Sequence, residues 1–363
     1  MNAAQKITLA DHYDPLALSL INRYSPQAMT SVFGAQAARA HPPMSIKDVA
    51  GVVQSRRPDL RGNFSATLTS TDFSHIINDV ANAAGLMGYV MNPPEILRIS
   101  HETNDIDNFL PVERVRPDGF PTLLAVDEGA EITYGTVGER GESYQAFRYS
   151  RILEFTEQAL INDRLHLLVH PALQIGEAVA DMKASVLAHR IASNPVLSDG
   201  KPVFHADHGN IGFGDPDMMH DTLVKATTAM RRQKHIDGER PLDVVPAFIL
   251  VPPELEVTAR KVVATVTPNS ITEVNPFAKK LEVLVEPRLT DPDTWYLFAR
   301  PERQLGLEHG TVNGTDDPEV RTEARMERHV VMTRVTADFA AGWIDYRGAF
   351  KIQPASSEEN PDA

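Results

Sequence analysis

Apolar residues recur at three- and four-residue steps from Phe73 to Val90, and this spacing predicts one amphipathic helix. The Ser-Thr pair at 70–71 can cap its start, and Asp72 suits the positive end of the helix dipole. The proline pair at 93–94 ends the helix. Because only one of its faces is apolar, we expect this helix to pack against other elements.

A longer helical pattern covers residues 163–193. Its apolar positions keep the helical period over about seven turns. They are Leu165, Leu168, Val169, Ala172, Gly176, Val179, Met182 and Val186. Pro171 falls inside the pattern, so we expect a kink or a helix start there, and Asn194-Pro195 ends the helix.

Shorter helices and strands alternate along the rest of the chain. Helices are predicted at 217–232 and 254–263, the second entered through the proline pair at 252–253. Strand patterns occur at 96–125, 244–251, 281–285, 295–298 and 326–352. These elements do not follow the regular βαβ order of a parallel sheet, so the sequence predicts an α+β fold.

A glycine-rich, charged stretch begins at Asp127 and lies between two extended arms. Apolar side chains of the second arm, at 147, 149, 153 and 155, share one face, so we predict a long β-hairpin with a charged tip. An exposed hairpin is an aggregation hazard for a monomer, but not where it lies on a neighbouring subunit. The candidate subunit-contact residues are Gly129, Gly135, Gly138, Glu139, Arg140, Gly141 and Glu142. We interpret the acids at 139 and 142 as solvated rather than as a general acid–base pair.

Residues 1–64 mix short helical pieces, Pro15–Arg23 and Ser45–Gln54, with proline-containing loops. The stretch 55–62 has the composition of an exposed linker. The sequence therefore predicts a separate, weaker unit here, a surface arm or appendage.

Composition excludes several classes of site. The chain has 363 residues and a formal net charge of −14, so we expect no basic face for sequence-specific nucleic-acid binding. It has no cysteine, which excludes disulfides, thiolate zinc sites and cysteine nucleophiles. There is no transmembrane-length apolar run, and the N-terminus lacks the order of a signal peptide. Neither GxxxxGK[ST] nor GxSxG occurs, so a P-loop and a nucleophile elbow are not expected.

The segment VFHADHGN, residues 203–210, is the one serious candidate for chemistry. It places His205, Asp207 and His208 within four positions, and two histidines with a carboxylate are a reasonable zinc ligand set. The same residue types also build turns, because short polar side chains bond to nearby backbone and Gly or Asn adopts positive φ. The residues leave both interpretations open.

Separate segments in one order resemble a known family. They are TSTDFSHIINDVANAA, GERGESYQAFRYSRILEFTEQALIND, DGKPVFHADHGN, NPFAKKLEVLVEPRL with WYLFARP, and TADFAAGWIDYRGAFKI. Together they resemble the major capsid protein of Mu-like tailed phages and prophages, a family that includes the capsid half of fused prohead protease–capsid polyproteins. The resemblance covers residues 65–352, whereas residues 1–64 resemble the family poorly.

The resemblance implies a Hong Kong 97-like capsid fold and assigns each part of the chain to it. Residues 1–64 would be an N-terminal arm or a scaffold-like segment, either retained or cleaved on maturation. The other parts would be 65–115, N-arm and lead-in to the peripheral domain; 116–150, extended loop; 151–204, peripheral domain with the spine helix; 205–320, mainly axial domain; 321–352, return to the peripheral domain; and 353–363, polar tail.

The implied function is structural, with no catalytic residue, cofactor or metal. The chain would self-assemble into hexamers and pentamers of an icosahedral head that encloses double-stranded DNA without sequence-specific binding. Its implied partners are a scaffold or prohead protease, a portal and a decoration protein, with no membrane. The implied location is the virion capsid, after synthesis and assembly in the cytoplasm of the bacterial host.

Two alternatives are kept. One is an encapsulin-like shell for cargo, built on the same fold. The other, of a different class, is a metal-dependent hydrolase that uses His205, Asp207 and His208. Beside the other family segments, these three residues are better interpreted as turn-forming and hydrogen-bonding residues.

Overall fold

The computed structural model describes residues 9–57, 59, 61–62, 67, 71–117, 139–156, 169–215, 219–235, 238, 240–264, 280–314, 318–325 and 330–354. The chain divides into two compact units. Unit 1 comprises Met1–Pro94, Arg148–Lys183 and Thr315–Asp338, and unit 2 comprises Glu95–Phe147, Ala184–Gly314 and Phe339–Ala363. Both contain helices and strands, which confirms the predicted α+β class.

Helices make up the N-terminal part of unit 1. They are α2 (Pro15–Tyr24), α3 (Pro26–Val32), α4 (Gly34–Ala40), α5 (Ile46–Arg56) and α7 (Thr71–Met91). The Asp14 carboxylate accepts the backbone N–H of Leu16 at 2.7 Å and so caps α2, while Ser45 and Asp48 form a reciprocal capping box on α5. The predictions of α2, α5 and α7 are confirmed. At seven residues each, α3 and α4 are too short to show a periodic pattern.

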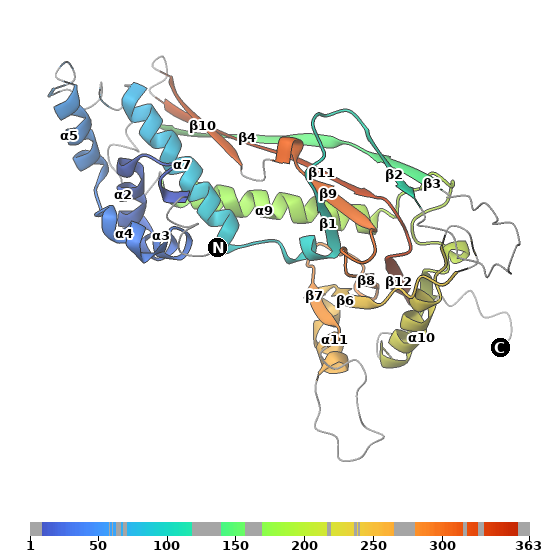
Figure 1. The fold of residues 1–363 in the computed structure, drawn as a ribbon. Helices are drawn as coiled ribbons and strands as arrows, with labels where there is room; N and C mark the ends of the chain where they lie inside the picture. Colours follow the sequence, from blue (N-terminus) through green and yellow to red (C-terminus); the bar gives the residue numbers. More distant parts are fainter. Residues whose placement is uncertain are drawn as a thin grey trace, which may run out of the picture. The chain divides into compact units, whose positions relative to one another are not determined.

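The four short helices share one hydrophobic core with α7, beside which they gather in Figure 1. Fully buried side chains from both groups meet there, among them Leu20, Ile21, Met29, Phe33, Val49, Val80 and Met87. The expectation of a separate, weaker unit is therefore wrong for residues 9–57. Helices this short cannot bury an apolar face alone, so they pack on the longer helix.

The backbones of α7 and α9 (Val169–Ala192) approach closely at glycines. A Cβ at Gly88 would overlap the backbone of Leu173, and one at Gly176 would overlap the carbonyl oxygen of Gly85. Glycine is thus required on both sides of this contact. The long predicted helix is confirmed over α9, which ends before Asn194 in a left-handed conformation (φ 45°); residues 163–168 lie outside the described part of the chain.

Unit 1 also contains a set of paired strands. The strand β10 (Glu319–Arg325) pairs antiparallel with the first half of β11 (Val330–Trp343), and β4 (Ala146–Thr156) also pairs with β11. The side-chain oxygens of Asn82 and Asn78 on α7 accept the backbone N–H groups of Val320, at 3.0 Å, and Thr322. These two hydrogen bonds fasten α7 along β10.

In unit 2, a short parallel pair joins β1 (Ser100–Thr103) to β9 (Leu307–Gly310), which pairs antiparallel with the second half of β11. A separate two-stranded antiparallel ribbon consists of β2 (Val112–Pro117) and β3 (Glu139–Tyr144). The Tyr144 ring lies where a Cβ on Gly342 of β11 would stand. Glycine at 342 therefore lets the ribbon pack close to β11.

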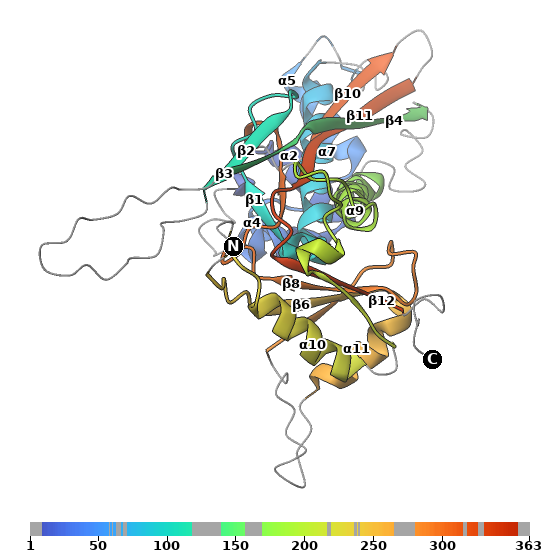
Figure 2. The same cartoon turned by 90° about the vertical axis from the view of Figure 1, so that its right-hand side faces the viewer.

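A second sheet of unit 2 has the strand order β5-β12-β8-β6-β7. The strands are β5 (Ile211–Phe213), β6 (Pro246–Val251), β7 (Glu282–Val285), β8 (Trp295–Ala299) and β12 (Ala349–Gln353). The helices α10 (Met219–Arg231) and α11 (Glu256–Val263) lie on one face of this sheet, as both ribbon views show, and share its apolar core (Figures 1 and 2). The predictions of α10, α11, β6, β7 and β8 are confirmed, whereas β9 and β10 were not predicted.

The predicted hairpin is only partly correct. An antiparallel ladder does form, between β2 and β3 with Pro117 opposite Glu139, and residues 118–138 between these strands lie outside the described part of the chain. The predicted second arm, with its apolar side chains at 147–155, is β4, which pairs with β11 and not with β2. A two-residue period identifies a strand but not its partner, which explains the error.

In the described part of the chain, none of the helices, α9 included, has the length and apolar character that crossing a membrane requires.

The glycine contact between α7 and α9 makes a stability prediction. We expect Gly176→Ala to lower the free energy of unfolding by about 2 kcal/mol or more, because the added methyl group meets backbone that cannot rotate away. Gly51→Ala on α5, where nothing lies within 4 Å, is the matched control and should raise that free energy by about 0.5–1 kcal/mol. Urea unfolding followed by circular dichroism measures the free energy of unfolding of both variants. Equal changes in the two variants would contradict a close approach of α7 and α9 at Gly176.

Candidate functional site

The segment 205–210 forms a tight turn in unit 2. His205 has extended backbone and precedes a single 3₁₀ turn at Ala206–His208, and its Nδ1 accepts the backbone N–H of Asp207 at 3.2 Å. Gly209 follows in the left-handed region with φ 61°. Asn210 is fully buried; its side-chain oxygen accepts the His205 N–H at 3.1 Å, and its amide donates to the Val203 carbonyl at 2.8 Å. Each residue type thus serves the turn.

His208 is the buried member of this segment. Its ring stacks on Tyr346 with centroids 3.8 Å apart and planes 3° from parallel. Its Nδ1 lies 3.0 Å from the Val203 carbonyl oxygen, and its Nε2 lies 2.9 Å from a carboxylate oxygen of Asp199. Both ring nitrogens therefore have partners within the protein.

The three metal candidates do not converge on one point. The Asp207 carboxylate faces solvent and bonds to the Lys201 ammonium at 2.6 Å, which lowers the pKa of Asp207. The His208 ring is directed instead to Asp199 and Tyr346. Across the described ranges, no three potential ligands come together. The geometry supports the turn interpretation and gives the hydrolase hypothesis no assembled site.

The structure places the candidate contact residues in two groups. Gly129, Gly135 and Gly138 lie outside the described residues, whereas residues 139–142 belong to the paired strand β3 and not to a tip. Glu142 is buried, and its carboxylate accepts the Ser198 hydroxyl at 2.6 Å and the Ser198 N–H at 3.0 Å. The interpretation of Glu142 as solvated is therefore wrong, because its side chain is on the inward face of the ribbon.

The same inward face carries an ion pair that the sequence analysis missed. The Arg114 Nε lies 2.7 Å from a carboxylate oxygen of Glu308, and its terminal nitrogen donates to the Thr103 hydroxyl at 2.7 Å. The Tyr144 hydroxyl donates to the same Glu308 oxygen. Burial, and then Glu308, raise the pKa of Tyr144, which keeps this phenol protonated as a donor. Arg114 and Glu308 are 194 positions apart, so no local pattern could pair them.

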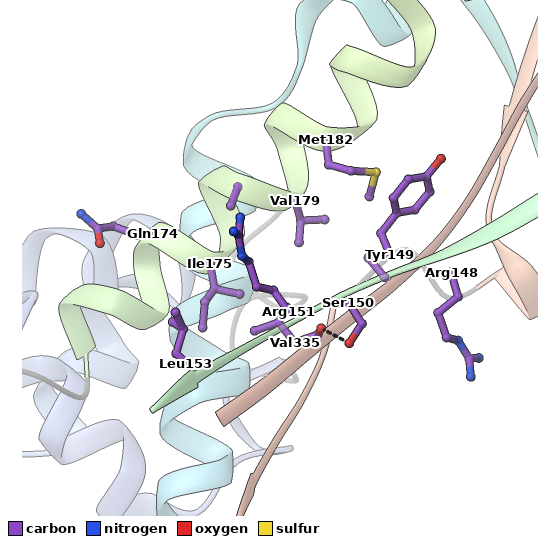
Figure 3. A pocket seen from close by; sticks show the side chains of 12 residues that line it. Arg148, Tyr149, Ser150, Arg151, Leu153, Gln174, Ile175, Val179, Met182 and Val335 are labelled. Carbon is purple, nitrogen blue, oxygen red and sulfur yellow. Dashed lines mark hydrogen bonds between the residues drawn. The ribbon is translucent and has the colours of Figure 1, made fainter. Parts of the chain in front are cut away.

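Unit 1 contains an apolar groove of about 670 Å³ between α9 and the strands β4 and β11 (Figure 3). Ile175, Val179 and Met182 of α9 face Leu153 and Val335 across it. The Ser150 hydroxyl donates to the Val335 carbonyl at 2.8 Å, and Arg148 pairs with Asp338 at 2.8 Å beside it. This lining offers apolar contact rather than chemistry.

Comparison with protein-family models gives one match for this chain. A family described as phage capsid protein matches residues 140–352, which is more than half of the chain. A search of curated proteins found no match.

Solved structures with a similar fold include structures of phages and of a virus-like particle. A structure of Microbacterium phage Oxtober96 is 11% identical and covers 73% of this chain and 92% of its own, with a TM-score of 0.50. The capsid of the cyanophage P-SCSP1u is 9% identical over 72% and 88% of the chains, also with a TM-score of 0.50. A virus-like particle from Pyrococcus furiosus is 11% identical over 75% and 97%, with a TM-score of 0.47.

Two substitutions distinguish a turn from a metal site. Asn210→Ala removes the acceptor of the His205 N–H and one of the two side-chain contacts of the Val203 carbonyl, so we expect it to lower the free energy of unfolding by about 1–3 kcal/mol. His205→Ala removes an exposed ring with one capping contact and should cost about 1 kcal/mol or less. Urea unfolding and elemental analysis of the purified protein measure both effects. Stoichiometric zinc in the parent that is lost in His205→Ala would restore the metal hypothesis.

Proposed function

The chain belongs to the phage capsid protein family, and from this premise we propose how its parts contribute to a shell. It is a major capsid protein, a structural protein and not an enzyme, which forms the icosahedral head of a phage and is located in the virion capsid. The observation that carries this conclusion is the family match over residues 140–352 on a chain with the Hong Kong 97-like fold.

We propose that the chain belongs to the Mu-like branch of these proteins. The support is the ordered series of segments at 69–84, 138–163, 199–210, 275–289 with 295–301, and 336–352. In this proposal the subunits form hexamers and pentamers and work with a scaffold or prohead protease, a portal and a decoration protein. The net charge of −14 suits a container that confines double-stranded DNA without tight adhesion.

We further propose that residues 118–138 contact a neighbouring subunit. The segment leaves the ribbon at Pro117 and returns at Glu139, which are paired across the ladder. A chain of this length can reach roughly 30 Å from its paired ends at about 3.3 Å per residue. Gly129, Gly135 and Gly138 are in this segment and stay candidate contact residues, whereas Glu139, Arg140 and Gly141 are at its root.

Replacement of residues 118–138 by a glycine–serine segment of equal length tests this assignment. We expect the variant to fold with an unchanged melting temperature and to form no closed shells in negative-stain electron microscopy, because subunit contacts are lost. The parent chain should form closed shells in the same preparation. The same replacement of the polar residues 355–363 is the control and should leave shells intact. Normal shells from the 118–138 variant would refute the contact.

We infer that residues 9–57 stay in the mature shell and are not a removable scaffold. The support is the shared core: the apolar side chains of α2, α3 and α5 cover those of α7 in unit 1. Their removal would expose buried side chains such as Ile76 and Val80 to water, at about 25 cal/mol per Å² of apolar surface.

Mass spectrometry of subunits from purified particles checks this inference. The expected mass includes residues 9–57, because cleavage just after α5 would remove more than half of the buried residues of this core. A chain that begins at residue 65 should be insoluble for the same reason. Particles built from subunits that begin after residue 62 would contradict retention.

A further inference from the structure

Glu142 ties the ribbon to a different part of unit 2. Its carboxylate accepts the backbone N–H and the hydroxyl of Ser198, at 3.0 and 2.6 Å. Hydrogen bonds to a charged acceptor are among the stronger ones in proteins, and the side chain is 8% exposed. Ser198 lies 56 positions further along the chain, in the connection between α9 and β5. The contact therefore links two segments that no regular hydrogen-bond ladder joins.

The connection that carries Ser198 is itself tightly held. Val196 and Pro202 form a β-bridge, and the Leu197 N–H donates to the Lys201 carbonyl at 2.8 Å, so Ser198 is at the end of a small hairpin. At its base, the Asn194 side chain bonds to both backbone groups of Phe204, at 2.7 and 3.1 Å. Ser198 is thus a rigid point of attachment.

The 205–210 turn supports this attachment from the other side. Asp199, the residue after Ser198, bonds to the His208 ring at 2.9 Å, and that ring stacks on Tyr346. A continuous series of contacts therefore runs from β3 through Glu142, Ser198 and Asp199 to His208. The segment that resembled a metal site thus contacts the end of the hairpin through Asp199.

We propose that Glu142 is a positioning residue for assembly: through Ser198 it holds β3, and thereby the root from which residues 118–138 leave the subunit. This inference rests on the proposed role of residues 118–138 in subunit contact. The Arg114–Glu308 pair and the packing of the Tyr144 ring at Gly342 hold the ribbon near β9 and β11. The Glu142–Ser198 contact adds an attachment to a different segment and so further restricts the orientation of the ribbon.

The test measures the critical concentration for shell assembly by size-exclusion chromatography. We expect Glu142→Ala to raise it about tenfold, the effect of a loss near 1.4 kcal/mol per subunit contact. Glu113→Ala is the matched control, because Glu113 has the same charge and lies on the exposed face of the same ribbon. This control variant should leave the critical concentration within about twofold of the parent value. Such a change corresponds to a free-energy difference well below 1.4 kcal/mol.

Further variants keep the proposal falsifiable if Glu142→Ala fails to fold. Ser198→Ala removes the hydroxyl donor and leaves the N–H, so we expect a smaller rise with an unchanged melting temperature. Glu142→Gln keeps one acceptor oxygen and should restore part of the assembly that Glu142→Ala loses. In the double variant, the effects of Glu142→Ala and Ser198→Ala should not add, because both disrupt one contact. A parent-like critical concentration in Glu142→Ala, or full additivity, would overturn the proposal.

This experiment distinguishes the two proposals. If Glu142→Ala assembles like the parent while replacement of residues 118–138 abolishes shells, only the positioning role is refuted. If the replacement itself leaves assembly unchanged, the contact segment has been wrongly identified, and the positioning role is refuted with it.

Discussion

A two-stranded β-ribbon buries too little surface to be stable alone. The ribbon of unit 2 therefore depends on side-chain contacts with the rest of that unit. The β2–β3 ribbon is held through its inward face, where Arg114 and Tyr144 meet Glu308 and where Glu142 meets Ser198. The cost of burying these charges is offset because each has a partner in hydrogen-bond geometry. In the proposal above, this root directs residues 118–138 to a neighbouring subunit, and because subunit contacts are repeated by symmetry, a small error in direction would be repeated with them.

In unit 1 the main requirement is to bury the apolar face of α7, a helix of 21 residues. Short N-terminal helices cover α7, and the contact of Gly88 and Gly176 with facing backbone brings α9 against it. The N-terminal region therefore belongs to the folded subunit, even though the family match begins only at residue 140.

Most of the long elements could be predicted from the sequence. In α7 and α9, for example, apolar residues recur with the helical period over many turns. The sequence could not predict pairing between distant segments: the pattern of 146–155 identifies a strand, but only tertiary structure selects β11 as its partner. Glu142 was interpreted as solvated for the same reason, since Ser198 is remote in sequence. The residue types at 205–208 are compatible with a metal site or a turn, and the contacts of His208 with Asp199 and Tyr346 support the turn.

A cryo-electron microscopy reconstruction of the assembled particle at side-chain resolution would show whether the ribbon directs residues 118–138 to a neighbour. We expect a closed icosahedral shell in which β2 and β3 keep the Pro117–Glu139 register, the Glu142 carboxylate stays hydrogen-bonded to Ser198, and residues 118–138 contact an adjacent subunit. A shell in which residues 118–138 contact only their own subunit, or a protein that stays monomeric under every assembly condition, would contradict this expectation.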